Sequence, residues 1–329
     1  MVLIRSNRFE WIDWMKALGI YLVVLGHFYS VGEKFIYVFH VPLFFLISGL
    51  LTKKEDDYRL FRKKLWYNLA VPMLIMATLN VVFDCVLDVM YGTFSPKDMY
   101  WFVRNVAFGM VSGFDALWFV YTLIMLKIIF QYSFSDKVFY TLAIVMLALA
   151  YMYNHVDLSV FPFFLKEPNS IVNTFTAFPF FAIGVYLRNF KGRLHEWNNK
   201  MVLMISFLCG LLLVVGCYYY NDYVAMYCCY YGQSMLLFLI GGVAGSIMIF
   251  AVSKFLGRAP KVIAIISRGT IIILGFHKLF IAMVREFFPA LYLDVFLAAL
   301  IVMLFVPIIM LIEQYFPLMA GKYRISSNK

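Results

Sequence analysis

The stretch DWMKALGIYLVVLGH, residues 13–27, decides the fold class and raises the question of function. It is apolar enough for a membrane helix, yet it carries Asp13, Lys16 and His27. A charged side chain at the centre of a bilayer helix costs roughly 2.5–3.5 kcal/mol even on the most lenient scale. Polar groups this costly face the interior of a helix bundle and are candidates for function.

The composition extends this conclusion to the whole chain. Of its 329 residues, 64% are hydrophobic and 14% are charged, and the mean hydropathy is +0.84. Soluble globular proteins have about 45–50% apolar and about 25% charged residues. Apolar runs close to the ~20 residues that span a bilayer recur along the sequence. The sequence therefore predicts an all-α, polytopic transmembrane helix bundle that forms one domain over residues 1–329.

Apolar runs and the residues that break them divide the chain into ten predicted spans. These lie near residues 12–32, 35–52, 65–90, 116–133, 137–153, 171–188, 201–220, 234–253, 269–287 and 291–316.

The distribution of Lys and Arg gives the expected orientation. With a cytoplasmic N-terminus, 20 of the 28 Lys and Arg residues fall on the cytoplasmic side, 5 fall outside and 3 lie within spans. This is a strong positive-inside bias, and it predicts that both termini are cytoplasmic. The net charge of +10 lies in short loops beside the membrane, so we expect contact with membrane lipids and no binding of nucleic acid.

Helical geometry places the polar residues of the first span on one stripe. At about 100° per residue, Lys16 and His27 lie within about 20° of each other, and Asp13 lies about 40° from His27. Lys16 is about 16 Å closer to the cytoplasm than His27. Asp13 and Lys16, three residues apart, are also spaced to pair with each other.

Further polar residues occur in the second and ninth spans. A short turn leads into the second span, so His40 should lie beside His27 and at a similar depth. The two histidines are either a structural pair or a general base with a companion, because only His titrates unaided near neutral pH. His277 and Lys278 add polar groups to the ninth span. We predict no metal, since no carboxylate partner is evident for the histidines.

The segment before the third span is basic, with Arg59, Arg62, Lys63 and Lys64. It is a topology signal, a phosphate site, or both. Trp118, in ALWFV at the start of the fourth span, is an interface anchor or a site residue. The long external loops are rich in aromatic residues, which suits either an interfacial belt or the stacking of sugars. We assign no chemistry to the five cysteines, including the adjacent Cys228 and Cys229.

Two segments carry a resemblance to a known family. RFEWIDWMKALGIYLVVLGH followed by FHVPLFFLISGLL resembles the opening of membrane acyltransferase family three, especially its fucose 4-O-acetylase-like branch. The family hallmark is an Arg or Lys, ten residues and then His, and Lys16 and His27 match it. The later segments RLFRKK, LWFV and ISRGTIIILGFH follow in family order.

The resemblance implies an enzyme of a bacterial inner or plasma membrane. Such proteins carry an acyl group, usually acetyl, from cytoplasmic acyl-CoA to a hydroxyl of an extracytoplasmic or lipid-linked glycan. We therefore expect acyl-CoA as donor substrate and no tightly bound cofactor. The expected roles are catalysis for His27 and His40, donor binding for Lys16, Arg59, Arg62, Lys63 and Lys64, and support for Asp13, Trp118, His277 and Lys278.

The residues alone leave two alternatives open. The first is a transporter or flippase of acyl or lipid-linked sugar intermediates, in which buried charges line the path. The second is a non-catalytic membrane protein of glycan assembly or sensing.

Overall fold

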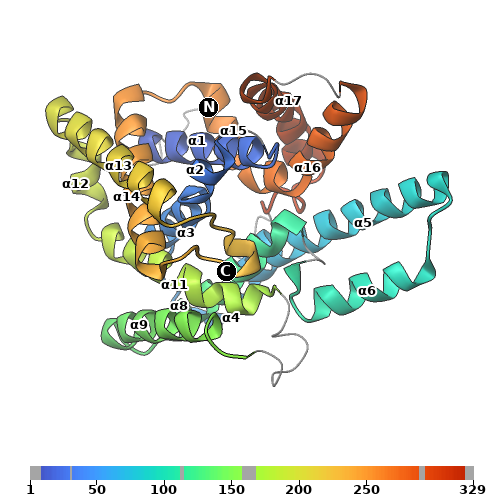
Figure 1. Ribbon diagram of the computed structural model, residues 1–329, viewed down its shortest axis with the longest axis horizontal. Coiled ribbons are helices and arrows are strands. Elements are labelled where there is room, and N and C mark those ends of the chain that lie inside the picture. Colours follow the sequence, from blue (N-terminus) through green and yellow to red (C-terminus); the bar gives the residue numbers. More distant parts are fainter. Residues whose placement is uncertain (1–8, 30–31, 112–114, 158–167, 289–292, 323–329) are drawn as a thin grey trace.

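The computed structural model describes residues 9–29, 32–111, 115–157, 168–288 and 293–322, and in this part of the chain every named element is helical (Figure 1). The principal helices are α1 (Glu10–Gly26), α2 (Glu33–Tyr37), α3 (His40–Leu51), α4 (Tyr58–Leu65), α5 (Val71–Tyr91), α6 (Pro96–Ala107), α8 (Trp118–Tyr132), α9 (Asp136–Tyr153), α11 (Ser170–Arg188), α12 (Lys191–Glu196), α13 (Lys200–Tyr220), α14 (Met235–Leu256), α15 (Lys261–Arg268), α16 (Thr270–Phe287) and α17 (Asp294–Tyr315). Short helical turns are η1 (Trp66–Ala70), η2 (Asp115–Leu117) and η4 (Met226–Cys228).

The helices confirm a polytopic membrane bundle. Within the described residues, seven helices are long and apolar enough to cross a membrane, and the bent pair α15–α16 makes an eighth candidate. The other two predicted spans coincide with shorter helices, the 17-residue α1 and the 15-residue α8. Each of the ten predicted spans thus overlaps a helix, while the number of crossings stays a prediction.

Four helices, α4, α6, α12 and α15, lie in segments between the predicted spans. In segment 53–64, Asp57 caps α4, since its side chain accepts a hydrogen bond from the Arg59 backbone N–H at 2.8 Å. This helix continues through the π-turn η1 into α5, so that Tyr58–Tyr91 forms one 34-residue helix. In segment 254–268, the apolar side of α15 packs on α1 and α17. These helices were not predicted from the sequence, because a basic segment that indicates topology can still be helical.

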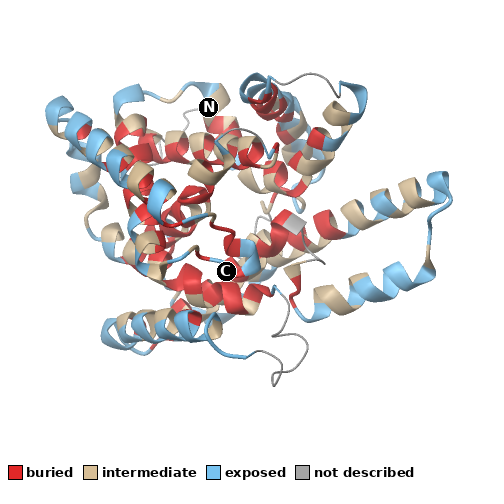
Figure 2. Cartoon of the chain, viewed as in Figure 1, coloured by how far each residue is buried: buried red, intermediate tan, exposed pale blue. Residues whose placement is uncertain are grey.

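Close contact between α3 and α11 forms the centre of the bundle. A Cβ atom on Gly49 would overlap the carbonyl oxygen of Phe181, and one on Gly184 would overlap that of Leu46. Such close approach of small residues is the usual way in which membrane helices associate, because apolar burial gives little net drive in lipid. Figure 2 shows the buried residues on these central helices and the exposed ones on the outer helices α5, α6, α9 and α13.

Hydrogen bonds join helix ends that are predicted to lie on the same side of the membrane. At one end, the Arg188 guanidinium of α11 donates to the carbonyl oxygen of Thr52, the C-cap of α3, at 2.7 Å. At the other end, the Tyr223 hydroxyl, which follows α13, donates to the Glu33 carboxylate at the start of α2 at 2.6 Å. Helix ends that the sequence assigns to the same side of the membrane thus contact each other in both cases.

A candidate active site between two cavities

His27 lies where α1 ends, as its C-cap residue. Its Nδ1 is 2.8 Å from the carbonyl oxygen of Val23, one turn earlier. A carbonyl oxygen only accepts hydrogen bonds, so in the neutral ring this contact assigns the proton to Nδ1. The lone pair is then on Nε2, which is the atom able to accept a proton from a substrate.

His277 of α16 contacts the His27 ring directly. Its Nε2 lies 3.3 Å from His27 Nδ1, and the ring centroids are 4.7 Å apart at an interplanar angle of 74°. His277 Nδ1 is 3.0 Å from the carbonyl oxygens of Ile273 and Leu274, which assigns its proton to Nδ1 as well. The His27 Nδ1–H is therefore shared between the Val23 carbonyl oxygen at 2.8 Å and His277 Nε2 at 3.3 Å, and both contacts hold the His27 imidazole in one orientation.

His40 has a different environment from the one the sequence suggested. Its Nδ1 lies 2.9 Å from the carbonyl oxygen of Ile36, and its ring packs against Tyr37 with centroids 4.9 Å apart. No hydrogen bond joins it to His27 in the described part of the chain. The histidine that meets His27 is His277, because the path of α16 brings it there. His40 faces the same cavity as His27, and its catalytic role stays a prediction.

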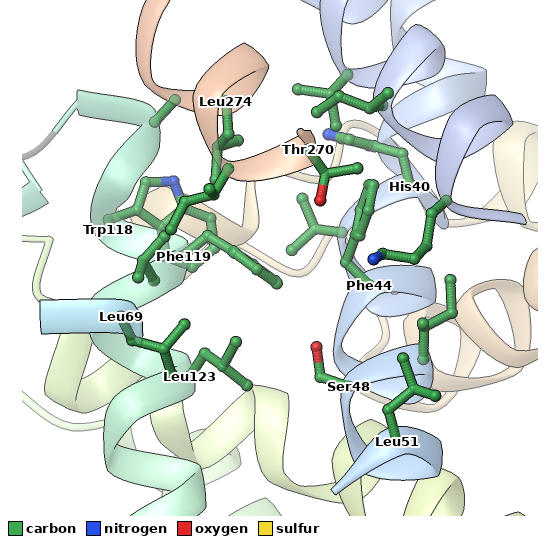
Figure 3. A pocket seen from close by; sticks show the side chains of 18 of the residues that line it. His40, Phe44, Ser48, Leu51, Leu69, Trp118, Phe119, Leu123, Thr270 and Leu274 are labelled. Atoms are coloured by element: carbon green, nitrogen blue, oxygen red, sulfur yellow. The ribbon is translucent and has the colours of Figure 1, made fainter. Parts of the chain in front are cut away.

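This first cavity, which we call the lysine cavity, has a volume of about 340 Å³. It lies between α1, α3, α8 and the start of α16, and its walls are mostly apolar. Figure 3 shows Trp118, Phe119 and Leu123 on one side, across from His40, Phe44 and Ser48. Besides the two histidines, its charged or hydroxylic lining residues are Lys16, Ser48, Lys127 and Thr270.

A second cavity of about 530 Å³, the tyrosine cavity, lies between α5 and α16 and the loop that contains η4. Its walls carry more polar groups, which are Tyr29, Tyr37, Asn80, Asp84, Tyr227 and Lys278. Aromatic faces beside amide and charged groups suit a sugar, whose surface alternates apolar C–H faces with hydroxyl groups.

Three residues line both cavities, namely His27, Ala116 and Trp118. The candidate base therefore lies at the junction of a mainly apolar cavity and a polar, aromatic one. Such a position lets one imidazole meet two substrates that enter from different sides.

Comparison with known proteins agrees with this geometry. A family model described as an acyltransferase domain matches residues 9–312. The chain belongs to the acyltransferase-3 family. It is a membrane acyltransferase, and the match spans helices α1 to α17, including the histidine pair and both cavities. No curated protein and no solved structure matches the chain. The likeness to the fucose 4-O-acetylase-like branch stays a prediction.

In this acyltransferase, the polar stripe of α1 faces protein as predicted. Lys16 and His27 both line the lysine cavity. Asp13 is buried, and its carboxylate accepts a hydrogen bond of 2.6 Å from the Ser267 hydroxyl of α15. This bond attaches α1 close to the 83° bend between α15 and α16.

The basic residues of α4 lie apart from the acyltransferase cavities. Arg59, Arg62 and Lys63 are exposed, and Lys64 forms an ion pair of 2.7 Å with Glu55. None of these four basic residues lines the lysine or the tyrosine cavity. Their binding of the donor stays a prediction, and it would have to take place outside the cavities.

Lys127 is the cavity cation that the sequence argument left without a role. Its ammonium donates to the Thr52 hydroxyl at 2.7 Å, beside the bond from Arg188 to the Thr52 carbonyl. Within the described ranges, neither Lys127 nor Arg188 forms an ion pair with a carboxylate. The sequence could have identified Lys127, because it is a single Lys in the apolar helix α8 and a cation in such a segment is a candidate site residue.

Tyrosines gather at the end of the bundle that the sequence predicts to be external. The rings of Tyr37 and Tyr223 stack with centroids 5.5 Å apart at 29°. Burial and the hydrogen bond to Glu33 raise the pKa of Tyr223, so its hydroxyl stays protonated and donates at neutral pH. The neighbouring Cys228 is exposed and Cys229 is buried, and both are free thiols.

Proposed function

We propose that this acyltransferase transfers an acetyl group from cytoplasmic acetyl-CoA to a hydroxyl of an extracytoplasmic or lipid-linked polysaccharide sugar. The observation that carries the proposal is the junction at His27, which lines both cavities. A thioester in one cavity and a hydroxyl in the other would meet at a single base. The predicted excess of Lys and Arg on one side of the membrane supports a donor that arrives from the cytoplasm.

The chemistry follows from the tautomer of His27. Its Nε2 accepts the proton of the acceptor hydroxyl while the hydroxyl oxygen attacks the thioester carbonyl, which is general base catalysis. His277 keeps the His27 ring oriented through the contact at Nδ1. Transfer through an acyl-histidine would use the same Nε2 as nucleophile. Both routes require His27.

The lysine cavity supports a donor that enters from the cytoplasmic end. Its apolar walls suit the pantetheine chain, which has no charged group. Lys16 and Lys127 place two amines in that cavity, where low polarity strengthens their attraction to anionic or carbonyl groups. Lys16 lies eleven residues before His27, about 16 Å along α1. The exposed cations of α4 would add a field that attracts the phosphates of CoA.

The tyrosine cavity supports a sugar acceptor. Tyr37 and Tyr227 supply aromatic surface, while Asn80 and Lys278 supply hydrogen-bond donors. The cavity lies beside the loop that contains η4, on the side assigned to the exterior.

One observation favours a second function, the transport of lipid-linked sugars. The bend of 83° between α15 and α16 divides a span next to the lysine cavity. Discontinuous helices beside a binding site are typical of secondary transporters.

The test is His27→Ala, compared with His195→Ala as a matched control. His195 is exposed on α12 and lines neither cavity. At equal membrane abundance, the loss of a general base should lower glycan O-acetyl esters by about 10²-fold or more, measured by mass spectrometry of exported glycan. The control should keep the wild-type level.

Two outcomes would contradict the proposal. Full acetylation in His27→Ala would remove His27 from the chemistry. A loss of glycan export in that variant, with acetylation of the remaining glycan unchanged, would favour the transporter.

A further inference from the structure

Trp118 shares the junction with His27. It is the first residue of α8, and its side chain is only 7% exposed. The ring packs beside Phe45, with centroids 6.5 Å apart, and it forms part of the wall of both cavities. Figure 3 shows the ring on the α8 side of the lysine cavity, next to Phe119.

The indole N–H of Trp118 has no hydrogen-bond acceptor among the residues that the structure describes. A buried Trp N–H usually finds an acceptor, because an unmade hydrogen bond costs stability. The Nε1 atoms of Trp11 and Trp14 also lack an acceptor, but they are sealed from solvent and line neither cavity. Nε1 of Trp118 is not sealed in this way, so that it can reach a ligand.

A comparison of the three residues that line both cavities also leads to Trp118 Nε1. Of the three residues that line both cavities, Ala116 has no polar side-chain atom, and His27 is the base. Acyl transfer also needs a hydrogen-bond donor where negative charge develops on the carbonyl oxygen. Among the residues that line both cavities, Trp118 alone remains to supply it.

We infer that Trp118 is a catalytic residue whose indole N–H donates to the carbonyl oxygen of the acyl group during transfer. This inference rests on the proposed function. The acceptor oxygen forms a bond to the thioester carbon, its proton passes to His27 Nε2, and the carbonyl electron pair moves to the oxygen, which Trp118 stabilises. The C=O bond then re-forms, the C–S bond breaks, and the leaving thiolate takes the proton from His27. The products are the ester and free CoA.

The donor acts strongly because of where it lies. On the side of the lysine cavity the junction adjoins mostly apolar side chains, so a hydrogen bond to a charged oxygen is less weakened by water there. The N–H is fixed by the packing of the ring against Phe45 and Phe119. It therefore needs no reorientation when the charge forms.

The experiment removes the N–H and keeps the ring. Trp118→Phe and Trp118→3-benzothienylalanine, the latter an isostere with sulfur in place of N–H, are assayed in native membranes with [14C]acetyl-CoA. Glycan-bound radioactivity is the readout. For both variants we expect kcat to fall by about 10²-fold, as for the loss of one oxyanion donor, with KM for acetyl-CoA unchanged. Trp11→Phe removes a sealed N–H outside the cavities and should keep wild-type kcat.

Each other outcome overturns the inference. If the benzothienyl variant keeps wild-type kcat, the N–H is not used. If KM rises while kcat is kept, Trp118 only binds the donor. A loss in Trp118→Phe that the benzothienyl variant does not share would show a packing role. The proposed function fails separately, if wild-type membranes transfer no label from acetyl-CoA to glycan.

Discussion

The two cavities that meet at His27 differ in chemistry more than in size. The lysine cavity is an apolar chamber with two amines, and the tyrosine cavity combines aromatic rings with amide and charged groups. A single binding chamber has no need for two such linings. The difference indicates two substrates of different chemistry, one a long chain with few charges and the other rich in hydroxyl groups. Four predictions test this division, from the largest effect to the smallest.

Blocking each cavity separately should break the comparison most clearly. Ser48→Phe fills the lysine cavity, and Leu87→Trp fills the tyrosine cavity. We expect both variants to lower glycan acetylation by about 10²-fold, since a misplaced reactant loses the oriented geometry of the reaction. Only Ser48→Phe should weaken binding of acetyl-CoA to the purified protein, measured by equilibrium dialysis. Equal donor affinity in the two variants would contradict the division.

Replacing the cavity amine should have the next largest effect. Lys127→Leu removes one of the two cationic donors, Lys16 and Lys127, from the lysine cavity. The KM for acetyl-CoA should therefore rise by about tenfold, because a hydrogen bond from a charged group contributes about 1.5–3 kcal/mol. Lys127→Arg should keep part of the affinity. The matched control is Lys137→Leu, at an exposed position of α9. If the KM of Lys127→Leu is no higher than that of Lys137→Leu, acetyl-CoA does not bind at Lys127.

The histidine that orients His27 should contribute less than the base itself. His277→Gln removes the imidazole partner of His27 Nδ1. We expect kcat to fall by about tenfold, equivalent to one neutral hydrogen bond of about 1.4 kcal/mol, with little change in KM. Steady-state kinetics in native membranes measures this. An unchanged kcat at normal protein abundance would show that the backbone contact to Val23 suffices to orient the ring.

The exposed cations of α4 should have the smallest effect. Arg59→Gln with Arg62→Gln removes two charges that lie outside both cavities. Solvent and salt screen such charges, so KM for acetyl-CoA should rise by only about two- to threefold at low salt and less at high salt. A larger rise, equal at all salt concentrations, would show that α4 binds the CoA phosphates by direct contact.

The sequence predicted the membrane-spanning helices better than the segments that connect them. All ten apolar runs coincide with helices, because length and hydropathy are local properties. Helices α4, α12 and α15, in the basic segments between spans, were not predicted, since Lys and Arg near a span indicate topology and carry little information on local conformation. Helix α15 also depends on its packing against α1 and α17, which a single run of sequence does not reveal.

The site shows the same limit. The spacing of Lys16 and His27 predicted a shared stripe, and both line one cavity. The same reasoning paired His27 with His40, because they lie on consecutive spans. The actual neighbour is His277, 250 residues away along the chain. Helical periodicity relates residues within one helix, whereas contacts between distant helices depend on how they pack.

By itself, the sequence determined that this chain is a helical membrane protein with polar groups in its first span, because the bilayer penalises every exposed polar group. It also carried the motif of the acyltransferase family. Only the tertiary structure decided which helix faces His27, that two cavities meet there, and that Lys127 and Trp118 line them. The physical reason is that a cavity is the space left between several packed helices, and no single helix encodes it.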